Sequence, residues 1–186
     1  MSDILFRRLT YMLSPQTDIY RHLAAHLKDK QVLEVGFGTG FGVLQYAGAA
    51  KLVTALDPDN GAVEFARTSI PLANVVWLNG DILKLWMPER FDAVVMIEVL
   101  EHIEPWMQAL ENAYTYLKPG GALYLSARNA NAELRKNDLH AREWNAAQLV
   151  AALKRFFPTV ELYDYALRVP QTVNTHQTPL LAVARK

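Results

Sequence analysis

A strand-like run that leads directly into a glycine turn is the feature that most constrains how this chain can fold. Residues 32–41 read V-L-E-V-G-F-G-T-G-F, so an apolar run is followed at once by Gly36, Gly38 and Gly40. Glycine adopts left-handed backbone conformations without steric cost, and a turn built from it lets backbone N–H groups approach a ligand closely. The pattern predicts a buried strand that ends at a ligand site, although so short a motif needs support from the rest of the chain.

The composition predicts one globular domain over residues 1–186. The chain is 51% hydrophobic with a formal net charge of zero, which suits a sizeable core and disfavours nucleic acid as a partner. It has no cysteine, which excludes disulfides, thiolate metal sites and a cysteine nucleophile. No apolar run approaches the ~20 residues of a membrane span, and the first residues do not follow the order of a signal peptide. We therefore expect a cytoplasmic protein without a membrane partner.

Strand-like and helical runs alternate along the chain after an amphipathic helix over 15–27, in which Ile19, Leu23 and Leu27 recur every four positions. Alternation of this kind predicts a doubly wound, mostly parallel sheet. The expected strands cover 31–35, 52–56, 75–78, 91–97, 122–127, 160–168 and 180–184, and the further helices 42–50, 59–69, 105–117 and 145–156.

The last two expected strands are joined without a helix, by a loop that contains Pro170 and Pro179. Two consecutive strands without a crossover pair antiparallel. The sequence therefore predicts an α/β fold with a seven-stranded sheet whose last strand is antiparallel, which departs from the arrangement of nicotinamide-binding domains.

With this topology the chain resembles the class I methyltransferases that use S-adenosylmethionine. The resemblance covers residues 32–186 and implies a Rossmann-like fold, S-adenosylmethionine as the cofactor and a small-molecule acceptor methylated on oxygen or nitrogen. Its motifs, in the expected order, are V-L-E-V-G-F-G-T-G from Val32, V-T-A-L-D-P-D from Val53, N-G-D-I-L from Asn79, F-D-A-V-V-M-I-E-V-L-E-H-I from Phe91 and L-K-P-G-G-A-L-Y-L from Leu117.

The first motif is expected to hold the methionine part of the cofactor. The resemblance implies that the turn with Gly36, Phe37, Gly38 and Gly40 passes under this part, and that Glu34 orients the turn or the amine. A structural alternative for Glu34 is a buried carboxylate bonded to nearby backbone N–H groups, because a buried carboxylate needs partners.

Two acidic residues at strand ends are expected to bind the nucleoside. Asp57 stands seventeen positions after Gly40, where a carboxylate accepts hydrogen bonds from both ribose hydroxyls, and Pro58 follows it into the site. The alternative for Asp57 is a helix N-cap. The resemblance implies that Asp81 accepts from the adenine amino group and that the Ile82 N–H meets a ring nitrogen, although Asn-Gly-Asp is also an ordinary turn.

The resemblance implies that Glu98, in the fourth motif, lies at the carboxyl end of the central strand, beside the methionine part of the cofactor. Glu101 and Glu104 follow before Pro105, where the helix dipole stabilises a negative charge by about 0.3–1 kcal/mol. His102 is open to two interpretations, a general base near the methyl group or a structurally bonded histidine.

The loop after the fifth expected strand is a candidate acceptor site. His140, Arg142 and Trp144 alternate, so an extended segment would put them on one face, where they could deprotonate, clamp an anion and stack on a ring. The alternative is a surface pair of Arg142 and Glu143, with Trp144 packed beneath a helix capped by Asn145.

The candidate catalytic residues are therefore His102, His140 and Arg142, and residues 1–30 are expected to contribute a helical segment to the acceptor side. No metal site is expected, because the spaced pair His22 and His26 lacks further ligands. Two rival functions are a nicotinamide-dependent oxidoreductase and a non-catalytic partner protein that binds S-adenosylmethionine. The sequence leaves a homo-oligomer open.

Overall fold

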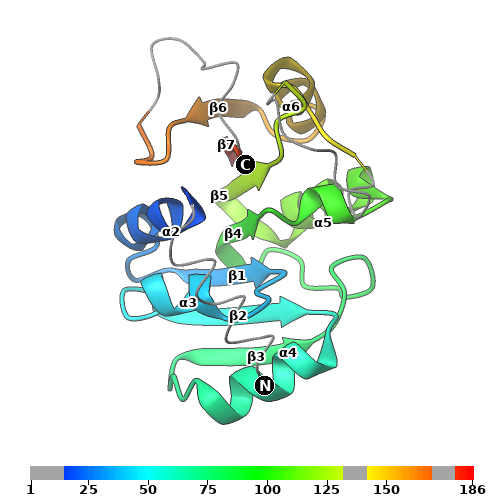
Figure 1. Ribbon diagram of the computed structural model, residues 1–186. Coiled ribbons are helices and arrows are strands. Elements are labelled where there is room, and N and C mark those ends of the chain that lie inside the picture. Colours follow the sequence, from blue (N-terminus) through cyan, green and yellow to red (C-terminus); the bar gives the residue numbers. More distant parts are fainter. Residues whose placement is uncertain (1–14, 132–141, 169–178) are drawn as a thin grey trace.

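Seven strands form one sheet at the centre of the computed structural model, which describes residues 15–131, 142–168 and 179–186 (Figure 1). The strands are β1 Gln31–Val35, β2 Leu52–Asp57, β3 Val75–Asn79, β4 Phe91–Ile97, β5 Leu117–Ala127, β6 Thr159–Tyr163 and β7 Leu180–Arg185. The helices are α2 Pro15–His26, α3 Phe41–Tyr46, α4 Asn60–Ser69, α5 Trp106–Tyr116 and α6 Ala146–Leu153, with a 3-10 turn η1 at Leu100–His102.

The order of the strands confirms the predicted fold class. It is β3-β2-β1-β4-β5-β7-β6, with parallel pairs from β3 to β5 and with β7 antiparallel to both of its neighbours. The strands β1 to β3 are added in one direction from β1, and β4 and β5 are added on the other side of β1. Ligands of open α/β sheets bind outside the carboxyl ends of the strands at such a reversal of strand order.

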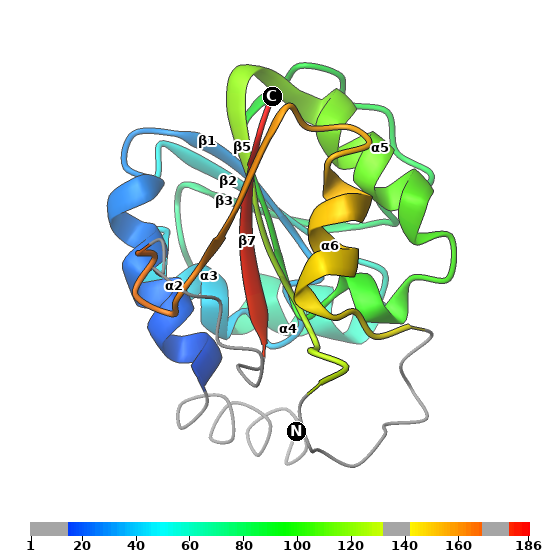
Figure 2. The same cartoon turned by 90° about the horizontal axis from the view of Figure 1, so that it is seen from above.

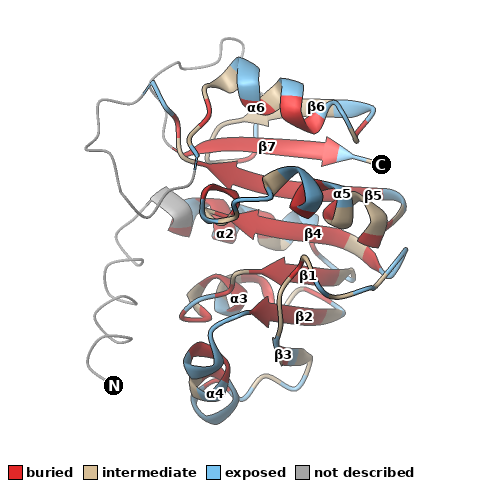
Figure 3. Cartoon of the chain, turned by 90° about the vertical axis from the view of Figure 1, so that its right-hand side faces the viewer, coloured by how far each residue is buried: buried red, intermediate tan, exposed pale blue. Residues whose placement is uncertain are grey.

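Two helical layers cover the sheet, with α2 and α3 on one side and α5 and α6 on the other (Figure 2). Because side chains alternate along a strand, neighbouring residues of β1 belong to different hydrophobic cores. Val32 lies in the core beneath α2, α3 and α4, and Leu33 lies in the core beneath α5 and α6. The central strands are therefore buried over most of their length, whereas the outer sides of α4 and α6 are exposed (Figure 3). This explains why several expected strands are nearly continuous apolar runs.

Most element boundaries agree with the sequence within one residue, but α3 ends at Tyr46 instead of 50, α6 ends at Leu153 instead of 156, and β5 begins at Leu117 instead of 122. The expected strand 160–168 was wrong in its second half, because the Asp164 carboxylate accepts the backbone N–H groups of Ala166 and Arg168 and closes a turn. The predicted cap of α6 is confirmed as a capping box formed by Asn145 and Gln148.

Candidate active site

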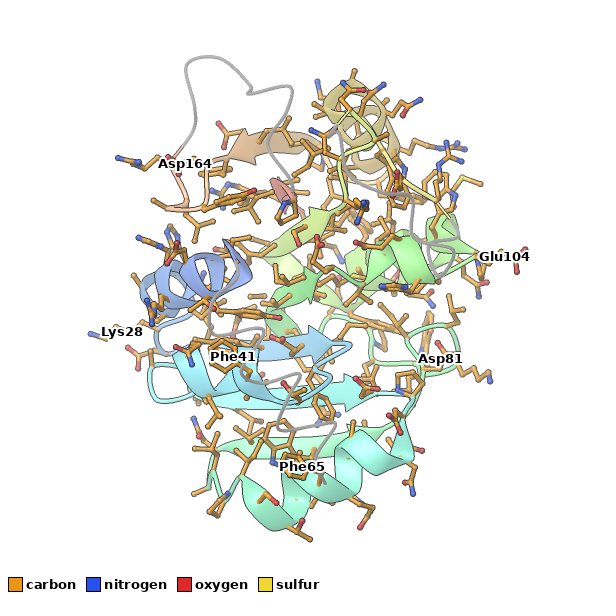
Figure 4. All side chains as sticks on the ribbon, viewed as in Figure 1. Lys28, Phe41, Phe65, Asp81, Glu104 and Asp164 are labelled. Atoms are coloured by element: carbon orange, nitrogen blue, oxygen red, sulfur yellow. The ribbon has the colours of Figure 1, made fainter. Side chains whose placement is uncertain are left out.

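Two adjoining pockets lie at the carboxyl ends of β1, β2 and β4. The larger has a volume of about 320 Å³ and the smaller about 60 Å³. In Figure 4, Asp81 of the larger pocket lies with Glu104 on the side where the parallel strands end, and Lys28, which precedes β1, lies on the opposite side, where β1 begins. The larger pocket is lined by Val35, Gly36, Leu56, Asp57, Pro58, Gly80, Asp81, Ile82, Glu98, Val99, His102 and Ile103. The smaller is lined by Tyr20, Gly36, Phe37, Gly38, Thr39, Phe41, Gly42, Ile97 and Glu98.

The glycine turn adopts the left-handed conformation that its sequence predicts. A Cβ atom at Gly36, where φ is +71°, would lie 2.6 Å from a Val99 methyl group, so a side chain is excluded there. At Gly38, where φ is +54°, no atom lies within 4 Å of that position. The turn therefore presents bare backbone to the smaller pocket, while the Phe37 ring packs edge-on against Trp77 at a centroid distance of 4.9 Å.

Asp57 connects the end of β2 to this turn. One of its carboxylate oxygens accepts the Gly38 N–H at 2.8 Å and the other accepts the Asp59 N–H at 2.9 Å. The expected alternative of a helix cap was wrong for Asp57, because Asp59 is the N-cap of α4 and accepts the Gly61 N–H at 2.8 Å. A carboxylate has about four lone-pair positions, so Asp57 keeps acceptor capacity for hydroxyl groups in the larger pocket.

Asp81 and Ile82 form a fixed turn at the far end of the larger pocket. The Asp81 carboxylate accepts the Leu83 N–H at 2.9 Å. The Ile82 carbonyl accepts the Asn112 amide at 2.9 Å and the Tyr116 hydroxyl at 3.1 Å. In the part of the chain that the structure describes, the Ile82 N–H makes no hydrogen bond, so this donor is available to a ligand.

Glu34 is buried behind the pockets and lines neither of them. Its two carboxylate oxygens accept the hydroxyls of Tyr20 at 2.9 Å and Tyr46 at 2.5 Å, instead of the backbone N–H groups expected as an alternative. Burial raises the pKa of Glu34 to about 7, although both tyrosine hydrogen bonds lower it. Because Tyr20 comes from α2 and lines the smaller pocket, it links the N-terminal segment to the glycine turn.

Glu98 stands at the end of β4 in a left-handed backbone conformation, with φ at +56°. Its N–H donates to the Ser126 hydroxyl oxygen at 2.9 Å, and that hydroxyl donates to a Glu98 carboxylate oxygen at 3.0 Å. A non-glycine residue with positive φ is uncommon, and this closed pair of bonds holds the residue there. Burial and then the charge of Glu101 raise the pKa of Glu98 to about 7, against the Ser126 hydrogen bond and the charges of Arg128 and His102.

Glu101 and the residues after β5 form a second polar group beside the site. Glu101 is 1% exposed, and burial raises its pKa to about 7, although the charge of Arg128 lowers it. Arg128 pairs with Glu143 at 2.6 Å. The expected alternative of an Arg142–Glu143 pair was therefore wrong.

The expectation that Trp144 stacks on a ligand was wrong, because its side chain is fully buried against Trp106. The exposed Arg142 guanidinium lies over the Trp106 ring at 5.0 Å and 5.8 Å from the Trp144 ring. In the described ranges Arg142 makes no ion pair, and it lines neither pocket. His140 lies outside the described residues.

Most of the expected cofactor residues meet at the two pockets. Glu34 and Gly40 do not line them, and Gly40 packs against Ile70 instead. Sequence reasoning missed Tyr20, whose only signal was an aromatic side chain on the apolar face of a helix. Of the candidate catalytic residues, His102 is exposed and lines the larger pocket.

A family model described as a methyltransferase domain matches residues 33–125, half of the chain. The chain belongs to this methyltransferase family. It is 31% identical over 142 residues to a probable S-adenosylmethionine-dependent methyltransferase of Mycolicibacterium smegmatis, covering 73% of this chain and 54% of that protein. It is also 32% identical over 124 residues to the ubiquinone biosynthesis O-methyltransferase of Rickettsia akari, covering 66% of this chain and 48% of that protein.

The fold has a solved counterpart in the N-methyltransferase NodS from Bradyrhizobium japonicum, in complex with S-adenosylhomocysteine. The TM-score is 0.67 with 23% identity, over 91% of this methyltransferase chain and 84% of NodS. The chain spans about half the length of the curated relatives that it matches. Within the described ranges, no helix has the length and apolar character to cross a membrane, and no three His, Cys, Asp or Glu side chains gather as a metal site would require.

Proposed function

We propose that this methyltransferase transfers a methyl group from S-adenosylmethionine to an oxygen or nitrogen of a small-molecule acceptor. The observation that carries the proposal is the convergence of Asp57, Asp81 and the unbonded Ile82 N–H on one pocket of about 320 Å³ beside the glycine turn. Asp57 ends β2, Asp81 and Ile82 follow β3, and the glycine turn follows β1, so the carboxyl ends of three strands contribute to the site. Their chemistry fits the polar groups of the cofactor.

Each part of the cofactor has a proposed partner. Asp57 accepts the ribose hydroxyls through its remaining lone pairs, with Pro58 beside it, and Asp81 and Ile82 meet the adenine edge. The bare backbone at Gly38 lies against the methionine part, in the smaller pocket that Tyr20 closes from α2. Residues 1–30 contribute to the acceptor side through this helix.

When bound, the cofactor would supply a methyl group on a positively charged sulfur. The lone pair of the acceptor would attack the methyl carbon, and the sulfur would keep the bonding electrons. The protein therefore has to orient the acceptor, exclude water and receive one proton. His102 on the rim of the larger pocket is one candidate base, and His140 is the other. Arg142 is proposed to bind the acceptor.

The acceptor class is part of the proposal. One relative is named as an O-methyltransferase and one fold neighbour as an N-methyltransferase, so both acceptor atoms stay open. The neutral net charge supports a small molecule over nucleic acid, and the lack of cysteine fits a cytoplasmic location.

Two experiments test the proposal. S-adenosylhomocysteine is expected to raise the thermal midpoint while NAD leaves it unchanged, because a ligand stabilises only the fold that binds it. The reverse result would favour the nicotinamide enzyme. Radiolabelled S-adenosylmethionine and fractionated small-molecule extract should then give a labelled product. Binding of S-adenosylhomocysteine without transfer of the label to any fraction would favour the alternative of a non-catalytic partner protein.

A further inference from the structure

Glu98 occupies a special position between the two pockets. Among the described residues, only Gly36 and Glu98 line both of them, and Glu98 is the one with a side chain. Under the proposed function, on which this inference rests, the smaller pocket takes the methionine part and the larger pocket the nucleoside. The sulfur atom joins these two parts, so it belongs where the pockets meet.

We propose that the Glu98 carboxylate is the counter-ion of the sulfonium and makes the site prefer the charged methyl donor over its neutral product. The donor and S-adenosylhomocysteine differ by one methyl group and one positive charge. A neutral site would bind both with similar strength. A fixed carboxylate at the junction attracts only the charged form.

The surroundings of Glu98 fix this carboxylate in place. The hydroxyl of Ser126, on the neighbouring strand β5, accepts the Glu98 backbone N–H and donates to one Glu98 carboxylate oxygen. Arg128, whose charge lowers the pKa of Glu98, is itself paired with Glu143 at 2.6 Å. The Glu98 carboxylate therefore keeps charge for a ligand.

The charges that face Glu98 determine how the preference varies with pH. These charged groups are Glu101 and His102 of η1, and Arg128, which follows β5. The charge of Glu101 raises the pKa of Glu98, and the charges of Arg128 and His102 lower it. Burial has the largest effect, and the pKa is raised to about 7. A bound sulfonium favours the ionised carboxylate, so donor binding releases a proton near neutral pH. Donor affinity then rises with pH up to about 7 and levels off above it. The affinity for the neutral product does not follow this change.

The test is calorimetry with S-adenosylmethionine and S-adenosylhomocysteine on the wild type, Glu98→Gln and Glu104→Gln. In the wild type, the ratio of product to donor Kd should rise about tenfold between about pH 5.5 and about pH 7.5. Glu98→Gln should lower this ratio. It should also remove the rise of the ratio with pH, apart from any contribution from titration of groups on the ligands themselves. The matched control Glu104→Gln removes an exposed carboxylate six residues away and should behave as the wild type.

His102 offers a competing cause, because a protonated imidazole would repel the sulfonium at low pH. His102→Asn should keep the rise of the ratio if Glu98 is the counter-ion. A rise that disappears in His102→Asn and persists in Glu98→Gln overturns the inference. A wild-type ratio that does not change with pH overturns it as well.

A second measurement needs only the wild type. Binding enthalpies in two buffers of different ionisation enthalpy should reveal proton release with the donor and none with the product, and equal release overturns the inference. Tight binding of both ligands without a preference for the charged donor would overturn the role of Glu98 and leave the proposed function standing. Failure of both ligands to bind would also remove the proposed function.

Discussion

The Asp57 carboxylate accepts the Gly38 backbone N–H at 2.8 Å, across nineteen positions of the chain. The residue that ends β2 therefore shapes the turn that follows β1. The same carboxylate faces the larger pocket. One side chain thus combines a structural and a binding role, and its substitution should change both.

For Asp57→Ala, we expect the affinity for S-adenosylhomocysteine to fall by about 1.5–3 kcal/mol, the range for charge-assisted hydrogen bonds. The free energy of unfolding should also fall, by about 1–3 kcal/mol, because two backbone N–H groups lose their acceptor. Calorimetry and urea unfolding measure the two effects. Asp59→Ala is the control, since it removes only the cap of α4 and should leave the affinity unchanged. An unchanged affinity in Asp57→Ala would restrict Asp57 to structure.

Glu34→Gln should change how stability depends on pH. Burial raises the pKa of Glu34 to about 7 from 4.5, so the folded protein holds this proton more tightly than the unfolded chain. Its stabilising effect is complete below about pH 4.5 and is lost as the pH rises to about 7, by about 2–3 kcal/mol. Urea unfolding of both proteins at about pH 5 and about pH 7.5 measures this difference, in which the shared effects of Glu98 and Glu101 cancel. Parallel pH profiles would contradict the prediction.

Gly42→Ala should disturb the contact between α2 and the glycine turn. A Cβ atom at Gly42 would lie 2.3 Å from the ring of Tyr20, whose hydroxyl donates to Glu34. We expect a loss of about 1–3 kcal/mol in the free energy of unfolding, the usual range for overpacking, and weaker binding of S-adenosylhomocysteine. Gly48→Ala is the matched control, because nothing lies within 4 Å of its added Cβ and its φ is not positive. Equal stability of the two variants would show that Tyr20 moves aside freely.

Arg142→Gln tests the acceptor side. We expect slower turnover or weaker acceptor binding, while the affinity for S-adenosylhomocysteine stays within about twofold, because Arg142 lines neither pocket. His140→Ala and His102→Asn belong in the same assay as the two candidate bases. The rate of S-adenosylhomocysteine release with an acceptor from the labelling screen is the measurement. Arg155→Gln, an exposed arginine after α6, serves as the control, and a loss of cofactor affinity in Arg142→Gln would move this residue away from the acceptor.

Local signals were sufficient for most of the elements and for part of the site. The strands 31–35 and 91–97 have the predicted bounds, because apolar runs between polar residues mark strand ends. Asp57 could be selected from its place after a buried strand. The capping box of α6 needs only four consecutive residues, so it could be read directly.

Contacts between distant elements could not be predicted in this way. The partners of Glu34 come from α2 and α3, and no pattern within β1 indicates them. The alternation of Arg142 and Trp144 predicted a shared face but not which face is buried. Burial of Trp144 depends on Trp106, which belongs to α5, about forty residues earlier in the chain.

The position of β7 has a consequence for biosynthesis. This strand is made after β6 but lies between β5 and β6, so neither neighbour can complete its pairing until residues 180–185 have left the ribosome. A nascent chain that ends at β6 exposes unpaired edge groups of the kind that promote aggregation. The sheet therefore closes only after residues 180–185 have been made, and chaperones that shield strand edges until then should raise the yield of folded protein.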